Sequence, residues 1–211
     1  MRLFRAQERD EATFFVSLAL MIPLIPASAD DAINPERPGF TNGAATVGKQ
    51  VFQIEEGLTR SEGKNKFGDG GLLRYGIAAQ TELRLGLPSW QRATGFSSAS
   101  YGLKTTLCPQ LGLIVQTSGE RHTQTQAALE AEFSLTREWT LQVDAVRDSH
   151  WASGFNFGRS LTQRLGMFVE GYHTDGWHGD GGLTYQLTTD QQVDLSGGDH
   201  FVSVGYTWRL R

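Results

Sequence analysis

The last ten residues of strand-like sequence, Phe201 to Leu210, alternate between apolar and polar side chains with a period of two. Successive side chains of a β-strand point to opposite sides, so this pattern predicts a strand with one apolar and one polar face. The residues of the apolar face, which a membrane barrel would turn toward lipid, are Val202, Val204, Tyr206, Trp208 and Leu210. Ser203, Gly205, Thr207 and Arg209 would then face the lumen of such a barrel.

A turn signature repeats along the second half of the chain. Similar segments begin at Leu135, Leu161 and Leu187, each 26 residues after the one before. A fixed period indicates one structural unit used several times, and alternating sequence flanks each turn. Looser versions near Ile77 and Leu107 bring the number of predicted hairpins to five. Five hairpins and one strand at each end predict twelve strands.

We therefore predict an all-β fold, an antiparallel up-and-down transmembrane β-barrel of about 12 strands. Short turns alternate with longer connections rich in Gly, Ser, Asp and His, which is the arrangement of outer-membrane barrels, with the short turns toward the periplasm. The expected strands are 50–59, 71–78, 81–88, 98–107, 110–117, 125–135, 139–147, 154–161, 165–172, 181–187, 191–197 and 201–210.

The same alternation turns many charged side chains inward. A dry core could not hold so many charges without a very large desolvation cost, whereas a water-filled lumen can. The sequence thus predicts a set of pore-lining residues: Arg74, Glu82, Arg84, Lys104, Glu130, Glu132, Asp144, Glu170, Asp194 and Arg209. The basic members gather on the early strands and the last one, and most acids on strands six to eleven, so a transverse field across the lumen is expected.

Three regions are expected along the chain. Residues 1–29 resemble a secretory signal peptide, because a short apolar run ends in Ala27-Ser28-Ala29, which predicts cleavage before Asp30. A buried N-terminal helix is the alternative, since acidic residues lie among the leading arginines. Residues 30–48 form a periplasmic N-terminal segment or a plug, and residues 49–211 form the barrel. No later apolar run is long enough for a membrane-spanning helix.

One stretch carries a family resemblance. The segment Leu73-Arg74-Tyr75-Gly76-Ile77-Ala78-Ala79-Gln80-Thr81-Glu82-Leu83-Arg84-Leu85-Gly86, with Pro35 to Thr41 and Phe52 to Gly57 before it, resembles the transporter-like family named for the meta-pathway of phenol degradation. The resemblance implies an outer-membrane β-barrel of Gram-negative bacteria, with a link by name to aromatic compounds. The chain has Glu36 where that family usually has Asp.

These features predict a cell outer membrane channel or transporter, porin-like, for passive passage of small molecules, including aromatic compounds. The alternative is a closed structural or surface-interaction barrel whose charges pair across a narrow lumen. The expected partners are outer-membrane lipid, small-molecule solutes and the barrel-assembly machinery. A net charge of −4 argues against nucleic acid.

We expect no enzyme activity and no cofactor. Cys108 has no partner cysteine, and the five histidines lie in or beside the long loops without strong metal-ligand spacing. Ser149 next to His150, and Ser153 close by, are the only local candidates for a nucleophile beside its base, and no nucleophile-elbow pattern surrounds them. No catalytic, cofactor-binding or metal-binding residue is therefore assigned.

Overall fold

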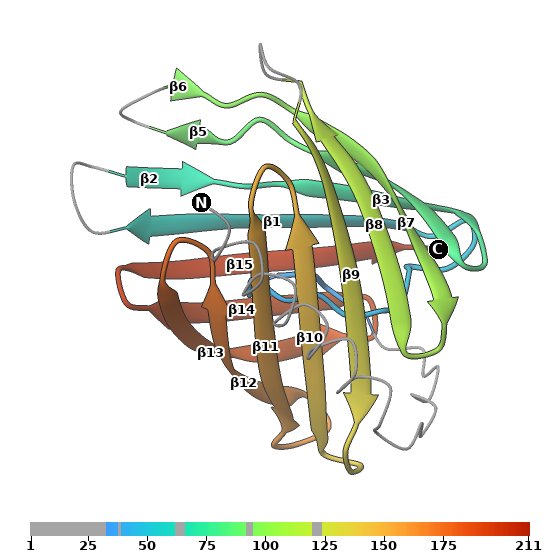
Figure 1. Cartoon of the computed structure of the whole chain (residues 1–211). Helices are drawn as coiled ribbons and strands as arrows, with labels where there is room; N and C mark the ends of the chain where they lie inside the picture. The colour runs from blue at the N-terminus through green and yellow to red at the C-terminus, as the bar shows by residue number, and fades with distance from the viewer. Residues whose placement is uncertain (1–32, 38, 62–65, 92–94, 120–123) are drawn as a thin grey trace, which may run out of the picture.

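The computed structural model describes residues 33–37, 39–61, 66–91, 95–119 and 124–211, and it forms one antiparallel sheet closed into a barrel (Figure 1). Every strand pairs with its sequence neighbours except around short interruptions, and β15 pairs with β1 to close the ring. The strands are β1 (Phe52–Ser61), β2 (Lys66–Asp69), β3 (Leu72–Ala78), β4 (Thr81–Gly86), β5 (Trp90–Gln91), β6 (Gly95–Phe96), β7 (Ser100–Cys108), β8 (Leu111–Ser118), β9 (Thr125–Ser134), β10 (Trp139–Arg147), β11 (Trp151–Ser160), β12 (Leu165–His173), β13 (Trp177–Thr188), β14 (Gln191–Gly198) and β15 (Phe201–Leu210).

Within the described ranges, fifteen strand segments form a barrel of twelve strands. Both β2 and β3 pair with β1, on either side of Gly70 and Gly71, and so form one interrupted strand of the barrel. In the same way β5 continues β4, and β6 continues β7, because β2 pairs with β5 and β5 with β6. The predicted all-β antiparallel barrel of about twelve strands is confirmed.

The observed strands reach further toward the long-loop rim than the sequence predicts. We expected strands to begin at residues 154 and 181, whereas β11 begins at Trp151 and β13 at Trp177. Both tryptophans pair across to the neighbouring strand, opposite Arg147 and His173, respectively. Aromatic residues favour strands, and the extra residue pairs lengthen β11 and β13 to 10 and 12 residues. Strands of this length are long enough to cross a membrane.

The outer surface of the barrel is mostly apolar. Alternate residues of β15 are exposed, and these are the apolar ones, while their polar neighbours are buried. Exposed aromatic side chains lie at both rims: Trp139, Tyr206 and Trp208 near the short turns, and Trp90, Tyr101, Trp151 and Trp177 near the long loops. Such a surface suits lipid bounded by two interfaces. Tyr172, also near the long-loop rim, instead faces inward and stacks on Phe40, with the ring centroids 5.0 Å apart.

In the described part of the chain, no helix is long and apolar enough to cross a membrane. The expected signal peptide, residues 1–29, lies outside the described residues.

Candidate functional site in the barrel lumen

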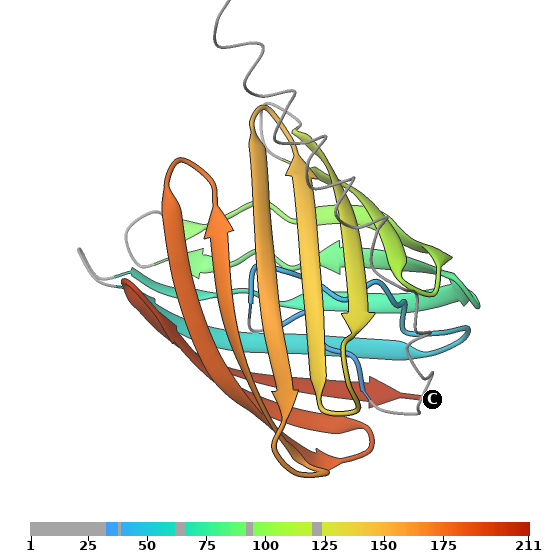
Figure 2. The ribbon, with the colours of Figure 1, turned by 60° about the horizontal axis from the view of Figure 1, so that its bottom comes forward.

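The interior of the barrel contains a stretch of the chain itself, which we call the luminal segment (residues 33–37 and 39–50). Its C-terminal end lies beside the β3–β4 turn, where the N–H of Gln50 donates to the carbonyl of Gly76. Followed from there toward its N-terminal end, the segment crosses the interior to β12 and then returns toward β1. Its two arms meet where Asn34 donates to the carbonyl of Ala45 at 3.2 Å. Figure 2 shows this segment inside the ring of strands.

Carboxylates of the barrel wall hold the backbone of the luminal segment. Glu170 on β12 accepts the N–H groups of Phe40 and Thr41, as well as the hydroxyl of Thr41. Asp144 on β10 accepts the N–H of Asn42 at 2.9 Å. Hydrogen bonds to a charged acceptor are stronger than neutral ones, so each contact contributes to keeping the segment in place.

The same mode of contact continues around the wall. Glu132 on β9 accepts the N–H of Ala44 at 3.2 Å, and Glu82 on β4 accepts that of Val47 at 2.8 Å. On β1 a single oxygen of Glu55 accepts the N–H groups of two consecutive residues, 36 and 37. Five carboxylates from five strands therefore bind backbone amides, and the wall recognises the segment by its main chain.

A buried charge network lies at the centre of the lumen. Arg74 pairs with Glu82 at 2.7 Å and with Glu55 at 3.1 Å, and all three side chains are fully buried. Glu36 of the luminal segment reaches into this network and contacts Arg74, Arg84 and Lys104. Buried charges are tolerated when they are paired and hydrogen-bonded, and here the segment supplies one of the partners.

Arg37 of the luminal segment occupies a notch in the wall. Gly57 on β1 and Gly205 on β15 are directly paired across the strands that close the barrel. A Cβ atom at either glycine would lie within 2.8 Å of the Arg37 Nε, so only glycine leaves room for the guanidinium. Arg37 also donates to the Ser203 hydroxyl at 2.9 Å.

Other wall glycines also face the segment. A Cβ at Gly154 would meet the ring of Phe40 and the methyl group of Thr41 at 2.8 Å, and one at Gly112 would meet the Ala44 carbonyl at 2.8 Å. Glycines in the wall thus leave room where the segment passes. The inner surface of the barrel is therefore complementary in shape to the segment.

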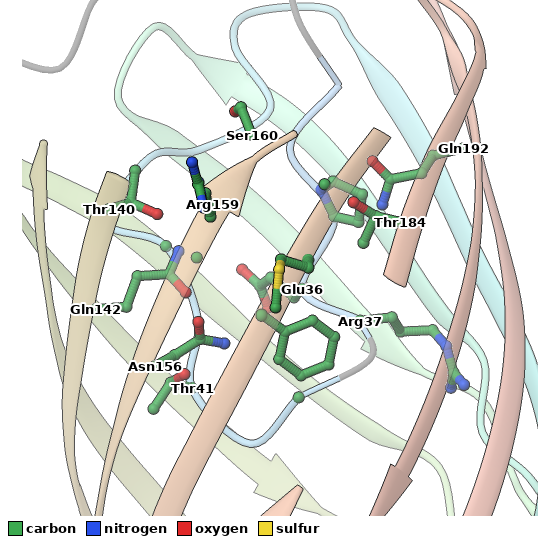
Figure 3. Close-up of a pocket in the computed structure, with 17 residues that line it drawn as sticks. Glu36, Arg37, Thr41, Thr140, Gln142, Asn156, Arg159, Ser160, Thr184 and Gln192 are labelled. Carbon is green, nitrogen blue, oxygen red and sulfur yellow. The ribbon is translucent and has the colours of Figure 1, made fainter. Parts of the chain in front are cut away.

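Space remains on both sides of the luminal segment. A cavity of about 220 Å³ lies toward the short-turn rim (Figure 3), between the segment and the inner faces of β10 to β14. In Figure 3, Thr41, Gln142 and Asn156 lie near one another, and Arg37 points away from them. Toward the long-loop rim lie cavities of about 410 and 260 Å³, which share Gln116 and Gln126. The segment therefore separates two hydrophilic spaces.

One patch of the inner wall is apolar. Ile114, Ala128 and Val146 form a buried cluster on β8 to β10, and Phe40 packs against it. All four residues line the 410 Å³ cavity. The 410 Å³ cavity is therefore lined by apolar side chains as well as by charged ones.

The structure places all ten residues predicted to line a pore on the inner side of the barrel or at its rim. Arg74, Glu82, Arg84, Lys104 and Glu130 come together in one network with Glu36 and Glu55. Glu132, Asp144 and Glu170 hold the luminal segment. Asp194 is buried beside the Arg37 notch, over Gly205. Whether these residues line an open path stays a prediction.

Arg209 differs from the rest of the set because it lies at the short-turn rim. It donates to Asp190 of the β13–β14 turn at 2.8 Å and to the carbonyl of Thr189 at 2.9 Å. The hydrogen bond from Arg209 lowers the pKa of Asp190. Its role in the structure is to fasten the end of β15 to the neighbouring turn.

The expected separation of charge between two walls is offset by the acids beside the basic residues. Glu55 and Glu82 on the early strands, together with Glu36, surround Arg74. The sequence pattern missed Glu36 and Arg37 as interior residues, because an irregular segment has no alternation to reveal its inner face. The only available sequence signal for their interior position was that these two charged residues lie within a run that contains Pro and Gly.

Among the described histidines, His150 and His200 lie between strands at the long-loop rim, whereas His173 ends β12 and His178 lies in β13. Ser149 Oγ lies 3.0 Å from His150 Nδ1, because both residues sit in a turn and not on a strand, where they would diverge. Asp148 accepts the His150 N–H at 2.7 Å, and this bond lowers the pKa of Asp148. The pair is exposed and belongs to an Asx turn. Across the described ranges, no three His, Cys, Asp or Glu side chains are placed to hold a metal ion.

Comparison with solved structures identifies the fold as that of outer-membrane channels. The KdgM porin, also solved in complex with disordered oligogalacturonate, matches with a TM-score of 0.59 at 10% identity, over 75% of this chain and 99% of that one. Omp33 of Acinetobacter baumannii matches with a TM-score of 0.54 at 9% identity, over 77% and 99%. An outer membrane channel from Pseudomonas putida F1 matches with a TM-score of 0.53 at 11% identity, over 84% and 100%.

At these identities the likeness shows the fold alone. No family model matches the sequence, and no curated protein matches it. The neighbours are porins and channels with twelve-stranded barrels, consistent with an outer-membrane location.

Proposed function

We propose that this protein is an outer-membrane channel for passive passage of small hydrophilic or amphipathic molecules. The observation that carries the proposal is a closed barrel with an apolar outer face and two polar spaces inside, separated only by an irregular segment. Helices or strands do not fill this lumen in the described part of the chain. The three solved channels with the same fold support it.

We further propose that residues 30–48 act as the plug of this channel. The described part of this region contacts β1, β4, β9, β10 and β12 through backbone hydrogen bonds and so spans the lumen. With the segment docked, the path between the two rims is narrow. Passage of a solute larger than a small ion then requires the segment to shift, and the docked form is the closed state.

An aromatic solute is the finer proposal for what passes. The patch formed by Phe40, Ile114, Ala128 and Val146 gives one side of the 410 Å³ cavity an apolar surface, and the amides of Gln116 and Gln126 lie on the same cavity. A ring with hydroxyl groups would match both surfaces. Reduction of the single-channel current by phenol or catechol, weakened in the Val146→Gln variant, would support it.

The test of the main proposal is single-channel recording of the refolded chain in a planar bilayer. Discrete current steps that scale with salt concentration support a channel. The competing function is a closed structural barrel, which the dense charge network around Arg74 favours. Deletion of residues 33–47 separates the two: a plugged channel then conducts more, whereas a structural barrel stays silent even though it folds.

A further inference from the structure

The wall that holds the luminal segment carries more acid than base. Between the two rims, the described interior side chains include four basic groups, namely Arg37, Arg74, Arg84 and Lys104. Eight carboxylates face them: Glu36, Glu55, Glu82, Glu130, Glu132, Asp144, Glu170 and Asp194. An excess of buried carboxylates attracts a cation into the same space.

Several of these carboxylates retain acceptor atoms that no hydrogen bond uses. Glu130 and Asp144 are directly paired across β9 and β10, and both are fully buried. Glu130 Oε1 and Asp144 Oδ1 have no donor among the described residues, although Asp144 Oδ2 binds the luminal segment. On the opposite wall, both oxygens of the buried Asp194 are likewise without a donor there. A buried acceptor without a hydrogen-bond donor costs folding free energy, so these oxygen atoms indicate a ligand that supplies hydrogen-bond donors.

The contacts of the luminal segment show which donors the wall accepts. Glu170, Asp144, Glu132 and Glu82 bind four successive parts of one extended chain through its N–H groups. The acceptors are spread along an arc over β12, β10, β9 and β4, and they do not converge on one point. A spread of this kind suits an extended ligand with several N–H donors better than a compact metal ion.

We propose that this wall is a binding site for extended cations with several N–H donors, the chemistry shared by polyamines and short basic peptides, and that such a cation competes with the luminal segment for the wall carboxylates. The inference rests on the proposed function in that the bound cation would open the channel. Binding itself requires only the carboxylates described above.

The test uses the full chain with Cys108→Ser and a single reporter, Asn42→Cys, reconstituted in vesicles. The rate of maleimide labelling at residue 42 is measured with spermidine, trilysine, trialanine or KCl at matched ionic strength. Spermidine and trilysine should each raise the rate at least fivefold, and trialanine and KCl less than twofold. A rise with only one of the two cations supports the site and identifies the source as amine or peptide.

Direct binding provides the second arm. Glu130→Gln should weaken spermidine or trilysine binding, measured by titration calorimetry, at least fivefold. The matched control is Glu138→Gln, which makes the same change on an exposed turn outside the lumen. Retention of the folded form is checked by migration on unheated gels.

The two arms separate this inference from the channel proposal. If the chain conducts but neither cation changes labelling beyond KCl, the cation site is refuted and the channel stands. If the cations bind and expose residue 42 but no current appears, the site stands and the channel proposal fails.

Discussion

Glu170 gives the sharpest test of how the luminal segment is held. Its carboxylate accepts three hydrogen bonds from the segment, from the N–H groups of Phe40 and Thr41 and from the Thr41 hydroxyl. The Glu170→Gln change keeps the size of the side chain but replaces one acceptor oxygen by an NH₂ group that faces other donors. The barrel wall itself is left intact.

The expected cost follows from those three bonds. A hydrogen bond to a charged group contributes about 1.5–3 kcal/mol, and the amide loses one to two of them, so docking weakens by roughly 1.5–6 kcal/mol. At about 1.4 kcal/mol per factor of ten, the undocked population of the segment rises roughly 10- to 20,000-fold.

Maleimide labelling of Asn42→Cys, in the Cys108→Ser background, measures that population. The labelling rate should rise by the same factor until the undocked form dominates, and the channel should spend more time in its larger conductance. Glu138→Gln serves as the control. A labelling rate within twofold of the parent, in a protein that still migrates as a folded barrel, would show that these hydrogen bonds do not hold the segment.

Three further predictions concern the notch, the charge balance and the rim. Gly57→Ala, whose Cβ would have its three nearest contacts in Arg37, should expel that side chain and raise labelling at residue 42 at least tenfold, whereas Gly176→Ala, which meets nothing within 4 Å, should leave it unchanged; equal rates would contradict the notch. Glu130→Gln with Glu132→Gln should lower the cation-to-anion permeability ratio at low salt, with a smaller effect near 1 M, where the Debye length falls to about 3 Å; an unchanged reversal potential would place these carboxylates off the path. Asp190 has a lowered pKa, so its bond to Arg209 stabilises the fold above the unfolded pKa of about 3.9 and is lost as the pH falls through the folded value. Asp190→Asn should therefore lower the thermal midpoint at about pH 7 but not at about pH 2, and a constant difference would refute this assignment.

The strands could be predicted from the sequence because membrane barrels enforce a strict alternation. In β15 each apolar residue is exposed to the outside and each polar one is buried, as the sequence of Phe201 to Leu210 predicts. A register error of one residue would place every charge in lipid, so the pattern has little freedom. The inward position of Arg74, Lys104 and Glu130 follows from the same rule.

The partners of those inward residues could not be predicted. Alternation gives the face of a residue but not the distance across the lumen, and it is silent on an irregular segment such as 33–50. Glu36 and Arg37 are therefore apparent only when the barrel is closed around them. Tyr172 illustrates a related limit: an aromatic residue near a rim fits an outer belt by composition, but its position on the inward face of β12 turns it toward Phe40.

The notch for Arg37 has a consequence for how the barrel assembles. One half of the notch, Gly57, comes from the first strand and the other half, Gly205, from the last, so the notch does not exist until the two ends of the chain meet. Docking of the segment and closure of the ring are thus linked equilibria, and each favours the other by the same free energy. The segment that restricts the lumen therefore also stabilises the pairing of the first and last strands, which closes the barrel.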